Sequence, residues 1–283
     1  MNAQAYHFGL LGHEIAYALS PQIFDLLFAH FETAGVFTVH DVPPDKLAAE
    51  VRKLSDLDGF SVTIPYKEKI IPFLDGMSEE AKVIGAVNSV RISKGRRLGH
   101  NTDLAGFIYP LRRETIKPGR VLILGHGGSA RAVLWSLVKE YPETIFTVCG
   151  RDHDKARSFV DSVTQGLADG RNLTPTTFAD ILDDDHYDLI VNCTPMGGGA
   201  VLDKSPLPDT FRFEQCRVCY DLVYQPALTP FLEKAAGRGC RTINGLPMLV
   251  VQAVTSYALW THQKLNVGGI SALILTKLGA GDG

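Results

Sequence analysis

The clearest chemical pattern in the sequence is a glycine-rich run of the form G-x-G-x-x-A, Gly125-His126-Gly127-Gly128-Ser129-Ala130. It follows the apolar stretch 121–124 directly and precedes a stretch of helical character over 132–138. In such a setting the first glycine permits a tight turn, the second lets backbone N–H groups approach a pyrophosphate, and the small Ala130 lets the helix pack closely on the strand. The positive end of the helix then faces the phosphates. We therefore expect the glycines, Ser129 and Ala130 to bind a dinucleotide; the simpler alternative is an ordinary tight turn.

The residues that end the next predicted strand should contact the adenine ribose, because they follow the glycines by about 20 residues or slightly more. They are Cys149-Gly150-Arg151-Asp152, with Lys155 close behind. The planar fork of an arginine can face a 2′-phosphate and favours NADP, whereas an aspartate accepts hydrogen bonds from a free 2′-hydroxyl and favours NAD. Arg151 occupies the first position after Gly150, so the sequence favours NADP, and NAD remains possible.

The elements that must position these residues alternate between strands and helices. In the first half, apolar runs predict strands at 6–11, 36–42, 60–64 and 86–92. Ser20-Pro21 predicts a helix start with serine as the N-cap, and 45–54 carries apolar residues on one helical face. A basic turn is expected at 95–97. This alternation indicates an α/β layer.

A second α/β series begins after the turn-like tripeptide Lys117-Pro118-Gly119. Its predicted strands are continuous apolar runs at 121–124, 145–148, 189–192 and 218–223. Runs of this kind are typical of parallel strands that are buried on both faces of a sheet. The tail has helical spacing over 246–260, and a last helix is expected over about 270–278. With 283 residues the chain is long enough for two domains.

Composition and charge indicate a small-molecule partner. The balance of 28 Lys+Arg against 31 Asp+Glu gives a net charge of −3, which supplies no general field for binding nucleic acid or an acidic membrane. Residues 1–11 lack the basic and apolar segments of a secretory signal, and no run approaches the roughly 20 apolar residues of a membrane span. Five cysteines, an odd number, fit a reducing cytoplasm. Cys216 and Cys219 form a C-x-x-C, but no second pair follows at zinc spacing, so no metal site is expected.

Eight short motifs, in order, resemble the shikimate dehydrogenase family over nearly the whole chain. They are Ile15-Ala16-Tyr17-Ala18-Leu19-Ser20-Pro21, Ser61-Val62-Thr63-Ile64-Pro65-Tyr66-Lys67, Gly85-Ala86-Val87-Asn88-Ser89, Asn101-Thr102-Asp103, the glycine loop, Asn192-Cys193-Thr194-Pro195-Met196-Gly197, Asp221-Leu222-Val223-Tyr224-Gln225-Pro226 and Met248-Leu249-Val250-Val251-Gln252-Ala253. Any one of them could arise by chance, but the ordered set is specific.

The resemblance implies two α/β domains with an active-site cleft between them. A substrate-binding catalytic domain would comprise 1–105 plus 246–283, and a Rossmann-type NADP-binding domain would comprise 106–245. The implied activity is the reversible, NADPH-dependent reduction of 3-dehydroshikimate to shikimate in aromatic amino acid (chorismate) biosynthesis. The implied catalytic pair is Lys67, which transfers the proton and polarises the hydroxyl, and Asp103, which orients Lys67 and binds the same hydroxyl.

The resemblance also assigns binding roles to residues that would otherwise be read as satisfying local backbone. The expected substrate ligands are Ser20, Thr63, Asn88, Tyr224 and Gln252. The expected cofactor ligands beyond the glycine loop are Arg151, Asp152, Thr194, Met196 and Gly245. The oligomeric state, monomer or homodimer, is left open.

The first motif departs from the family pattern, which is usually H-S-x-S-P. Here Tyr17 stands for the histidine and Ala18 for the first serine, while Ser20 remains. One hydrogen bond to the substrate carboxylate, worth about 1.5–3 kcal/mol, must be lost or supplied elsewhere, for example by Tyr17 or Tyr224. Further departures are Ser61, Asn244 and Pro247, which replace the commoner Asn, Asp and Gly.

Three other functions are consistent with parts of this pattern. Asp152 and the altered Tyr17-Ala18 motif favour an NAD-dependent quinate/shikimate dehydrogenase of catabolic type, whereas Arg151 opposes it. A non-catalytic dinucleotide-binding regulator would be expected to lose the acid–base pair, yet Lys67 and Asp103 are present. A folate-type dehydrogenase has little motif support.

Overall fold

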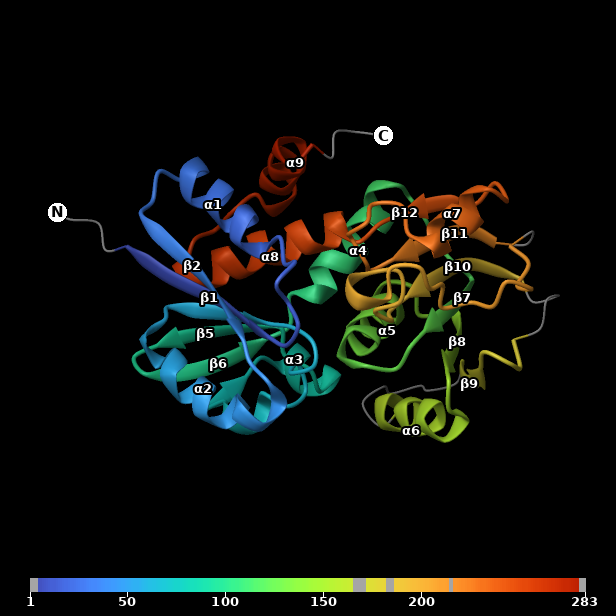
Figure 1. Cartoon of the computed structure of the whole chain (residues 1–283), viewed down its shortest axis with the longest axis horizontal. Coiled ribbons are helices and arrows are strands. Elements are labelled where there is room, and N and C mark those ends of the chain that lie inside the picture. The colour runs from blue at the N-terminus through green and yellow to red at the C-terminus, as the bar shows by residue number, and fades with distance from the viewer. Residues whose placement is uncertain (1–4, 165–171, 182–185, 214–215, 280–283) are drawn as a thin grey trace. The chain divides into compact units, whose positions relative to one another are not determined.

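The computed structural model describes residues 5–164, 172–181, 186–213 and 216–279 (Figure 1). It divides into two compact units, Met1–Gly106 with Leu249–Gly283, and Phe107–Met248. The breaks expected from the sequence, 105/106 and 245/246, lie close to these bounds. Each unit has its own six-stranded sheet. Among the described residues, no helix has both the length and the apolar character needed to cross a membrane.

The first unit is built on a mixed sheet with the strand order β2-β1-β3-β5-β6-β4. Its strands are β1 (Tyr6–Gly12), β2 (Gly35–Asp41), β3 (Gly59–Val62), β4 (Gly76–Met77), β5 (Ser89–Ser93) and β6 (Arg96–His100). Its helices are α1 (Ser20–His30), α2 (Leu47–Lys53), α3 (Glu79–Ile84), the start of α4 (Asp103–Arg113), most of α8 (Leu246–Thr261), and α9 (Val267–Lys277), with 3-10 turns at Pro44–Lys46, Leu54–Asp56 and Ile71–Phe73. β1 pairs in parallel with β2 and β3, whereas β5 runs antiparallel to β3 and β6.

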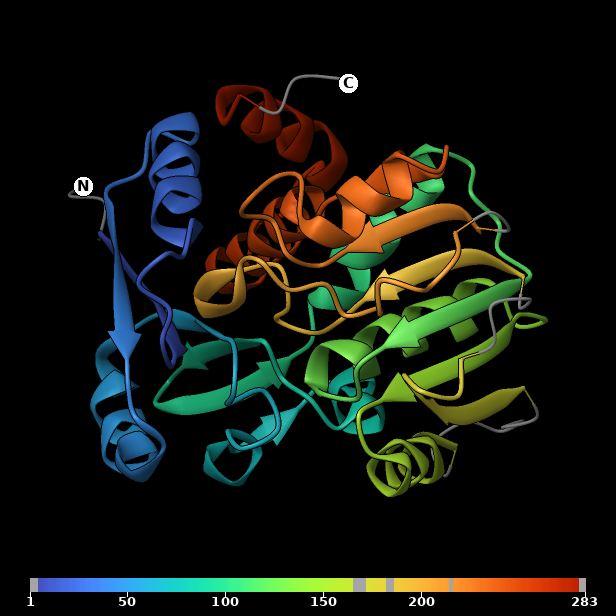
Figure 2. The same cartoon turned by 45° about the vertical axis from the view of Figure 1, so that its right-hand side comes forward.

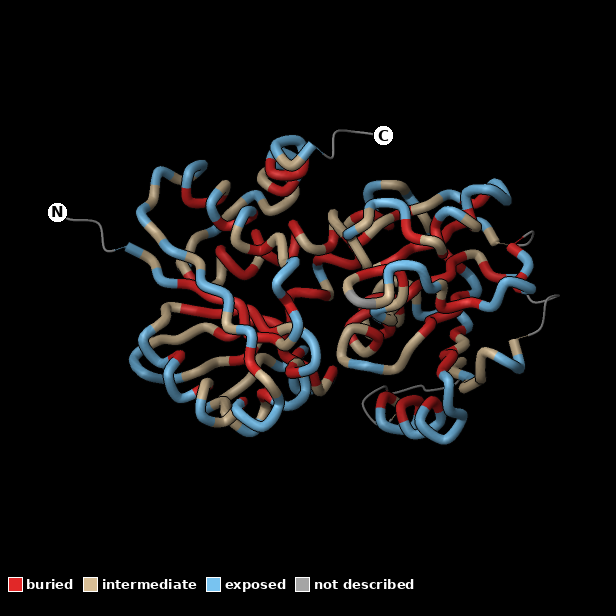
Figure 3. The backbone as a smooth tube through the Cα atoms, in the orientation of Figure 1, coloured by how far each residue is buried: buried red, intermediate tan, exposed pale blue. Residues whose placement is uncertain are grey.

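An aromatic cluster fixes helix α8, the last but one in the chain, to this first sheet. The ring of Trp260 lies 4.8 Å from that of Phe8 on β1 and 5.4 Å from that of Phe24 on α1, measured between centroids. A Cβ atom at Gly59 of β3 would lie 2.5 Å from the Trp260 ring, so the absence of a side chain there permits the contact. Most of β1 and all of β3 are buried, and buried residues are drawn in red in Figure 3. These contacts hold most of α8 in the first unit, to which the C-terminal part of the chain belongs.

The second unit is a parallel sheet with the order β12-β11-β10-β7-β8-β9. Its strands lie side by side in Figure 2 and are β7 (Arg120–Leu124), β8 (Ile145–Gly150), β9 (Leu173–Thr177), β10 (Tyr187–Asn192), β11 (Cys216–Asp221) and β12 (Arg241–Ile243). Its helices are the rest of α4, α5 (Gly128–Glu140), α6 (His153–Thr164) and α7 (Pro230–Ala236), with a 3-10 turn at Gly199–Val201. When β7 to β12 are numbered 1 to 6 and the sheet is read from β9, the order is 3-2-1-4-5-6, which is that of a Rossmann fold. The predicted fold class is confirmed.

The central strand β7 is buried on both faces, as its continuous apolar run predicts. Val121 and Ile123 belong to one apolar cluster, whereas Leu122 and Leu124 belong to another, and none of the four is exposed. Because side chains alternate along a strand, the two clusters are the cores on the two faces of this sheet. The glycine loop therefore follows a strand that is held on both sides.

Several predicted elements differ in detail. The expected strand at 86–92 begins only at Ser89, because the unpredicted helix α3 ends at Ile84 and Gly85 follows it with φ 69°. The expected basic turn is a turn only around Gly95, and β6 starts at Arg96. Ser20 is the first residue of α1 and does not cap it; Leu19 is the N-cap. β9 was not predicted, because as an edge strand rich in threonine it lacks an apolar run.

Candidate active site

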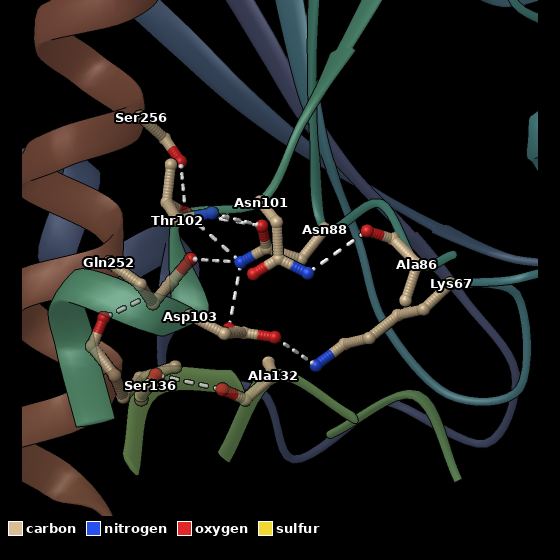
Figure 4. A network of polar contacts seen from close by, with 11 residues as sticks. Lys67, Ala86, Asn88, Asn101, Thr102, Asp103, Ala132, Ser136, Gln252 and Ser256 are labelled. Carbon is tan, nitrogen blue, oxygen red and sulfur yellow. Dashed lines mark hydrogen bonds and ion pairs between the residues drawn. The ribbon is translucent and has the colours of Figure 1, made fainter. Parts of the chain in front are cut away.

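Lys67 and Asp103 form a sheltered ion pair in the first unit (Figure 4). Nζ of Lys67 donates to Oδ2 of Asp103 at 2.7 Å, and the two side chains are 13% and 6% exposed. A lysine ammonium can hydrogen bond to an alcohol or carbonyl oxygen and carry its proton. Asp103 is the first residue of α4, where the helix dipole favours a carboxylate. The pair thus has the composition and the geometry of an acid–base group.

The backbone around Lys67 is fixed on both sides. The preceding residue, Tyr66, is fully buried, and its hydroxyl donates to the carbonyl of Val42. The carbonyl of Lys67 itself accepts from the N–H of Val87 at 2.7 Å. With its backbone fixed in this way, the long side chain starts from a defined position, which lowers the entropy lost when it pairs with Asp103.

Asn88 holds the other oxygen of the aspartate. Its Nδ2 donates to Oδ1 of Asp103 at 2.8 Å, and its Oδ1 accepts from the backbone N–H of Thr102 at 2.7 Å. Nδ2 also lies 3.0 Å from Oγ1 of Thr102 and 3.4 Å from Oε1 of Gln252. An amide nitrogen has two hydrogens, so it cannot serve all three acceptors at once. The contact with Gln252 is the longest and the easiest to exchange for a ligand.

Helix α8 contributes two polar residues to the same network. Gln252 faces Asn88, and Nε2 of Gln252 donates to the carbonyl of Leu249 at 2.8 Å. One turn later, Oγ of Ser256 lies 3.1 Å from Oγ1 of Thr102. Sequence reasoning missed Thr102 and Ser256 as members of the site. The spacing of four residues between Gln252 and Ser256 places both on one helix face and was the available signal.

The remaining predicted substrate ligands of the first unit lie on segments tied together at the ends of β1 and β3. The loop before Ser20 is joined to the residues after β3 by a hydrogen bond of 3.0 Å from the N–H of His13 to the carbonyl of Ile64. A Cβ atom at Gly12 would lie 2.6 Å from Cγ2 of Thr63, so Thr63 packs directly on the end of β1. Ser20 is buried and Thr63 is half-buried. The predicted ligand Tyr224 is half-buried in the second unit.

The altered motif lies in a turn in which the N–H of Ala18 donates to the carbonyl of Ile15 at 3.0 Å. The side chain of Tyr17 is 43% exposed. Partial burial, and then the nearby Glu14 carboxylate, raise the pKa of Tyr17 above its ordinary value. The phenol therefore stays protonated at neutral pH and keeps a hydrogen-bond donor beside the alanine.

The glycine loop of the second unit has the predicted form, with strand β7 before it and helix α5 after it. Gly125 has φ 106°, a conformation that favours glycine, and its N–H donates to the carbonyl of Cys149 at 2.7 Å. Gly127 is the N-cap of α5 and has no side chain with which to cap it. Ala130 is fully buried, whereas Gly128 and Ser129 are half-buried. The first N–H groups of α5 thus meet the requirement for binding a phosphate.

Arg151 and Asp152 follow β8 and play different parts. Oδ1 of Asp152 accepts from the N–H groups of Asp154 and Lys155 at 3.0 and 3.1 Å, so that Asp152 caps helix α6. The hydrogen bond from Lys155, and then that from Asp154, lower the pKa of this carboxyl. Arg151 is exposed. The aspartate is engaged with its own helix, and the position beside it carries the cation that a 2′-phosphate requires.

The other predicted cofactor ligands also follow strands of the parallel sheet at its carboxyl edge. After β10, Thr194 donates through Oγ1 to Oδ1 of the buried Asn192 at 2.7 Å, and the N–H of Met196 approaches the same hydroxyl at 3.3 Å. A Cβ atom at Gly125 would lie 3.1 Å from Cγ2 of Thr194, so the loops after β7 and β10 touch. After β12, a Cβ atom at Gly245 would lie 2.1 Å from the carbonyl oxygen of Leu222, a position that excludes any side chain. Dinucleotides bind at this edge in such sheets.

Asp221 ties these loops together and was not singled out from the sequence. It is fully buried at the end of β11 and accepts from Nδ2 of Asn192 and the N–H of Val223 at 2.9 Å each, and from Oγ1 of Thr229 at 2.6 Å. Burial raises the pKa of Asp221 to about 6 although these three hydrogen bonds lower it. The predicted ligand Tyr224 lies in the segment that Asp221 anchors.

Comparison with known proteins places the chain in a family. The profile described as shikimate dehydrogenase substrate binding domain matches residues 10–90. The shikimate dehydrogenase (NADP(+)) of Alkaliphilus metalliredigens is 34% identical over 280 residues, which cover 95% of this chain and 96% of that one. Two solved structures each superpose over 96% of this chain and 99% of their own. The Thermus thermophilus shikimate 5-dehydrogenase with NADP(H) and shikimate is 29% identical, with a TM-score of 0.80. The Corynebacterium glutamicum quinate dehydrogenase with NAD is 26% identical, with a TM-score of 0.82. The family predicted from the eight motifs is confirmed. The chain belongs to the shikimate dehydrogenase family.

Proposed function

We propose that this chain is an NADP-dependent shikimate dehydrogenase that reversibly reduces 3-dehydroshikimate to shikimate in aromatic amino acid biosynthesis. The observation that carries the proposal is the sheltered Lys67–Asp103 pair at 2.7 Å, whose aspartate is held on its other oxygen by Asn88. Relatives about 34% identical over nearly their whole length carry this activity in their names. A non-catalytic regulator would be expected to lose this pair.

The roles of the side chains follow from what a ketone reduction requires. NADPH, when bound, supplies the hydride. Lys67 gives a proton to the oxygen of the ketone, and in the oxidation direction takes it from the hydroxyl. Asp103 keeps Nζ of Lys67 in place and accepts from the same hydroxyl. Asn88 prevents the carboxylate from rotating, since it holds Oδ1 at 2.8 Å while Oδ2 faces Lys67.

The remaining substrate groups are assigned to polar side chains of suitable type. Gln252 can turn its Oε1 toward a ring hydroxyl at small cost, because its contact with Asn88 is long, at 3.4 Å. Thr63 is proposed to bind a second hydroxyl. Ser20 is proposed to bind the carboxylate, with Tyr17 or Tyr224 in place of the serine that Ala18 replaces.

The residues of the second unit fit NADP. The uncapped start of α5 at Gly127 suits the pyrophosphate, and exposed Arg151 suits the 2′-phosphate. Asp152, the residue that would favour NAD, is occupied as the N-cap of α6. Thr194, Met196 and Gly245 follow strands at the same sheet edge and are proposed to line the nicotinamide end.

The competing function is an NAD-dependent quinate/shikimate dehydrogenase of catabolic type. Ala18 is the observation that favours it, because a weaker carboxylate site fits a substrate that differs at that end of the ring. The likeness to a quinate dehydrogenase with NAD is also close, with a TM-score of 0.82. The engaged state of Asp152 speaks against it.

A single assay separates the two functions. NAD(P)H absorbance is recorded while the purified protein receives shikimate or quinate, each with NADP⁺ and with NAD⁺. Efficient turnover of shikimate with NADP⁺ alone is expected. Preference for quinate or NAD⁺ would establish the catabolic type, and no turnover despite cofactor binding would overturn both. The Lys67→Ala protein, prepared in parallel, shows how much of the signal comes from contaminating dehydrogenases.

A further inference from the structure

Three cysteine thiols converge in the second unit, at the amino-terminal ends of β11 and β12. Cys216 is the first residue of β11, Cys219 follows in the same strand, and Cys240 directly precedes β12. The loops assigned to the dinucleotide follow the opposite, carboxyl ends of the strands. The cysteine cluster is therefore separate from the proposed active site, and none of its members has a role there.

The sheet itself brings the third cysteine to the other two. β11 and β12 pair in parallel, with Cys219 opposite Thr242. Cys240 lies two residues before Thr242, and side chains two apart on a strand point to the same face. Cys219 and Cys240 thus share one face of the sheet. Cys216, at the strand end, completes the group, and its Sγ lies 3.5 Å from that of Cys219.

The three sulfurs lie almost as close together as the ligands of a metal site. All three Sγ atoms lie within 4.8 Å of one another. Tetrahedral zinc, with Zn–S bonds of about 2.3 Å, holds its sulfur ligands about 3.8 Å apart. Small side-chain movements are enough to bring the three sulfurs to that separation. A disulfide would need two of these sulfurs and would leave the third unexplained.

The surroundings select for a soft cation. Cys219 and Cys240 belong to a buried apolar cluster that includes Phe213, Phe231 and Leu232. Within the described part of the chain, the group of metal-ligating side chains at this place holds the three cysteines and neither carboxylate nor imidazole. Thiolate ligands favour Zn²⁺ and Cu⁺, whereas Mg²⁺ and Ca²⁺ require oxygen ligands.

We propose that Cys216, Cys219 and Cys240 bind one thiophilic d¹⁰ cation, with Zn²⁺ as the representative ion. Each thiol gives its proton to solvent as its sulfur coordinates, and no oxidation state changes. Cys216 is half-buried, so a small exogenous ligand can reach the fourth zinc position from its side. The bound ion would join the start of β11 to the start of β12 and stabilise this end of the sheet.

Sequence spacing alone could not reveal this site. Cys216-x-x-Cys219 is half of a zinc motif, and no second pair follows at the usual distance. The third ligand comes from the next strand of the sheet, which only the fold places beside the first two. The expectation that the chain has no metal site rested on local spacing and is replaced by this proposal.

The test uses the full-length, reduced and chelator-treated protein. Co²⁺ and then Zn²⁺ are titrated in, while thiolate-to-cobalt charge-transfer absorption and a competing zinc indicator are recorded. One cobalt per chain with thiolate bands, displaced by one zinc, is expected. Cys216→Ser and Cys240→Ser should each weaken binding by more than about tenfold, because losing an outer-shell partner already costs about 10–100-fold.

The matched control is Cys149→Ala, which removes a fully buried thiol of the same unit that is not one of the three proposed ligands. It should bind cobalt and zinc as the unmodified chain does. Failure of the unmodified chain to give thiolate bands at micromolar cobalt would overturn the proposal. So would equal binding by the Cys216→Ser/Cys240→Ser double variant, which would locate the ion elsewhere. The half-buried Cys216→Ser variant alone keeps the test decisive should the double variant fail to fold.

Discussion

The proposed chemistry depends on one side chain fixing the next. Nζ of Lys67 is held by Asp103, and Asp103 is held by Asn88. Asn88 is oriented in turn, because the backbone N–H of Thr102 donates to its Oδ1 at 2.7 Å, which leaves Nδ2 to face the carboxylate. Only Lys67 and Asp103 are assigned to touch the reacting oxygen. Asn88, which is also an expected ligand of a ring hydroxyl, and Thr102 position Asp103 for this step, so their loss should move Asp103 rather than remove a proton donor.

Lys67→Ala should lower kcat far more than it weakens shikimate binding. General acid–base groups contribute about 10²–10⁴-fold to rate, and Lys67 is assigned that step. The measurement is kcat from steady-state kinetics together with Kd from shikimate titration. Lys82→Ala is the matched control, since it breaks a lysine–glutamate pair of 2.6 Å that lies on the surface. Near-normal kcat in Lys67→Ala would remove this residue from the mechanism.

Ala18→Ser should restore the missing hydrogen bond to the substrate carboxylate. A hydrogen bond to a charged group contributes about 1.5–3 kcal/mol, so we expect the KM for shikimate to fall by about tenfold or more, with kcat little changed. Ala16→Ser, at an exposed position of the same loop, serves as the control. An unchanged KM would mean that Tyr17 or another donor already fills the place of the serine.

At the scale of elements, we expect cofactor choice to depend on Arg151, in the segment between β8 and α6. Arg151→Gln should raise the KM for NADP⁺ and leave that for NAD⁺ unchanged, because only NADP⁺ carries the 2′-phosphate.

Asp152→Ala should lower the melting temperature through loss of the α6 cap, with the NADP⁺/NAD⁺ preference unaltered. A shift toward NADP⁺ in Asp152→Ala would instead show that this carboxylate faces the ribose.

The glycine loop offers a test in which stability and binding separate. Gly127 has φ −94°, and a Cβ atom placed on it would meet nothing within 4 Å. Gly127→Ala should therefore fold, with a melting temperature that falls only slightly because alanine is a poorer N-cap than glycine. A pyrophosphate lying against the loop would meet the new methyl group, so the KM for NADP⁺ should rise by about tenfold, or about 1.4 kcal/mol. Unchanged cofactor kinetics would place the phosphates elsewhere. Gly237→Ala, whose added Cβ would meet only ordinary contacts, is the control.

At the scale of the whole chain, local sequence patterns predicted single elements, whereas the groups of interacting residues that are distant in sequence became visible only in the fold. Strand β7, the glycine loop and helix α5 are contiguous, so their sequence alone predicts them. Lys67 and Asp103 are separated by 36 residues and were paired only through the family resemblance. The joint roles of Ser256, Asp221 and Cys240 depend on contacts between distant segments, which periodicity does not record. The capping role of Asp152 was readable, since aspartate directly before a helix is a common N-cap.

Asp221 links the stability of the second unit to pH. Burial raises its pKa from 3.8 to about 6, so between these values the folded state binds a proton that the unfolded state does not. Protonated Asp221 therefore stabilises the folded state fully below about pH 4. This stabilisation, about 3 kcal/mol of unfolding free energy, is lost as pH rises through 6. Asp221→Asn keeps Oδ1 as acceptor for Val223 and Asn192, and its amide can donate to Thr229.

Urea unfolding of both proteins at pH 4, 5.5 and 7 measures this difference. As pH rises, the unfolding free energy of Asp221→Asn should increase relative to that of the unmodified chain. The variant lacks the carboxyl whose ionisation destabilises the unmodified protein. Asp209→Asn in the same unit is the control. Pairing with Lys234 lowers the pKa of that exposed carboxyl, so its ionisation does not destabilise the folded state as pH rises. Parallel curves for Asp221→Asn and the unmodified chain would show that Asp221 ionises as readily in the folded state as in the unfolded one. The three donors around it would then be sufficient to hold a buried charge.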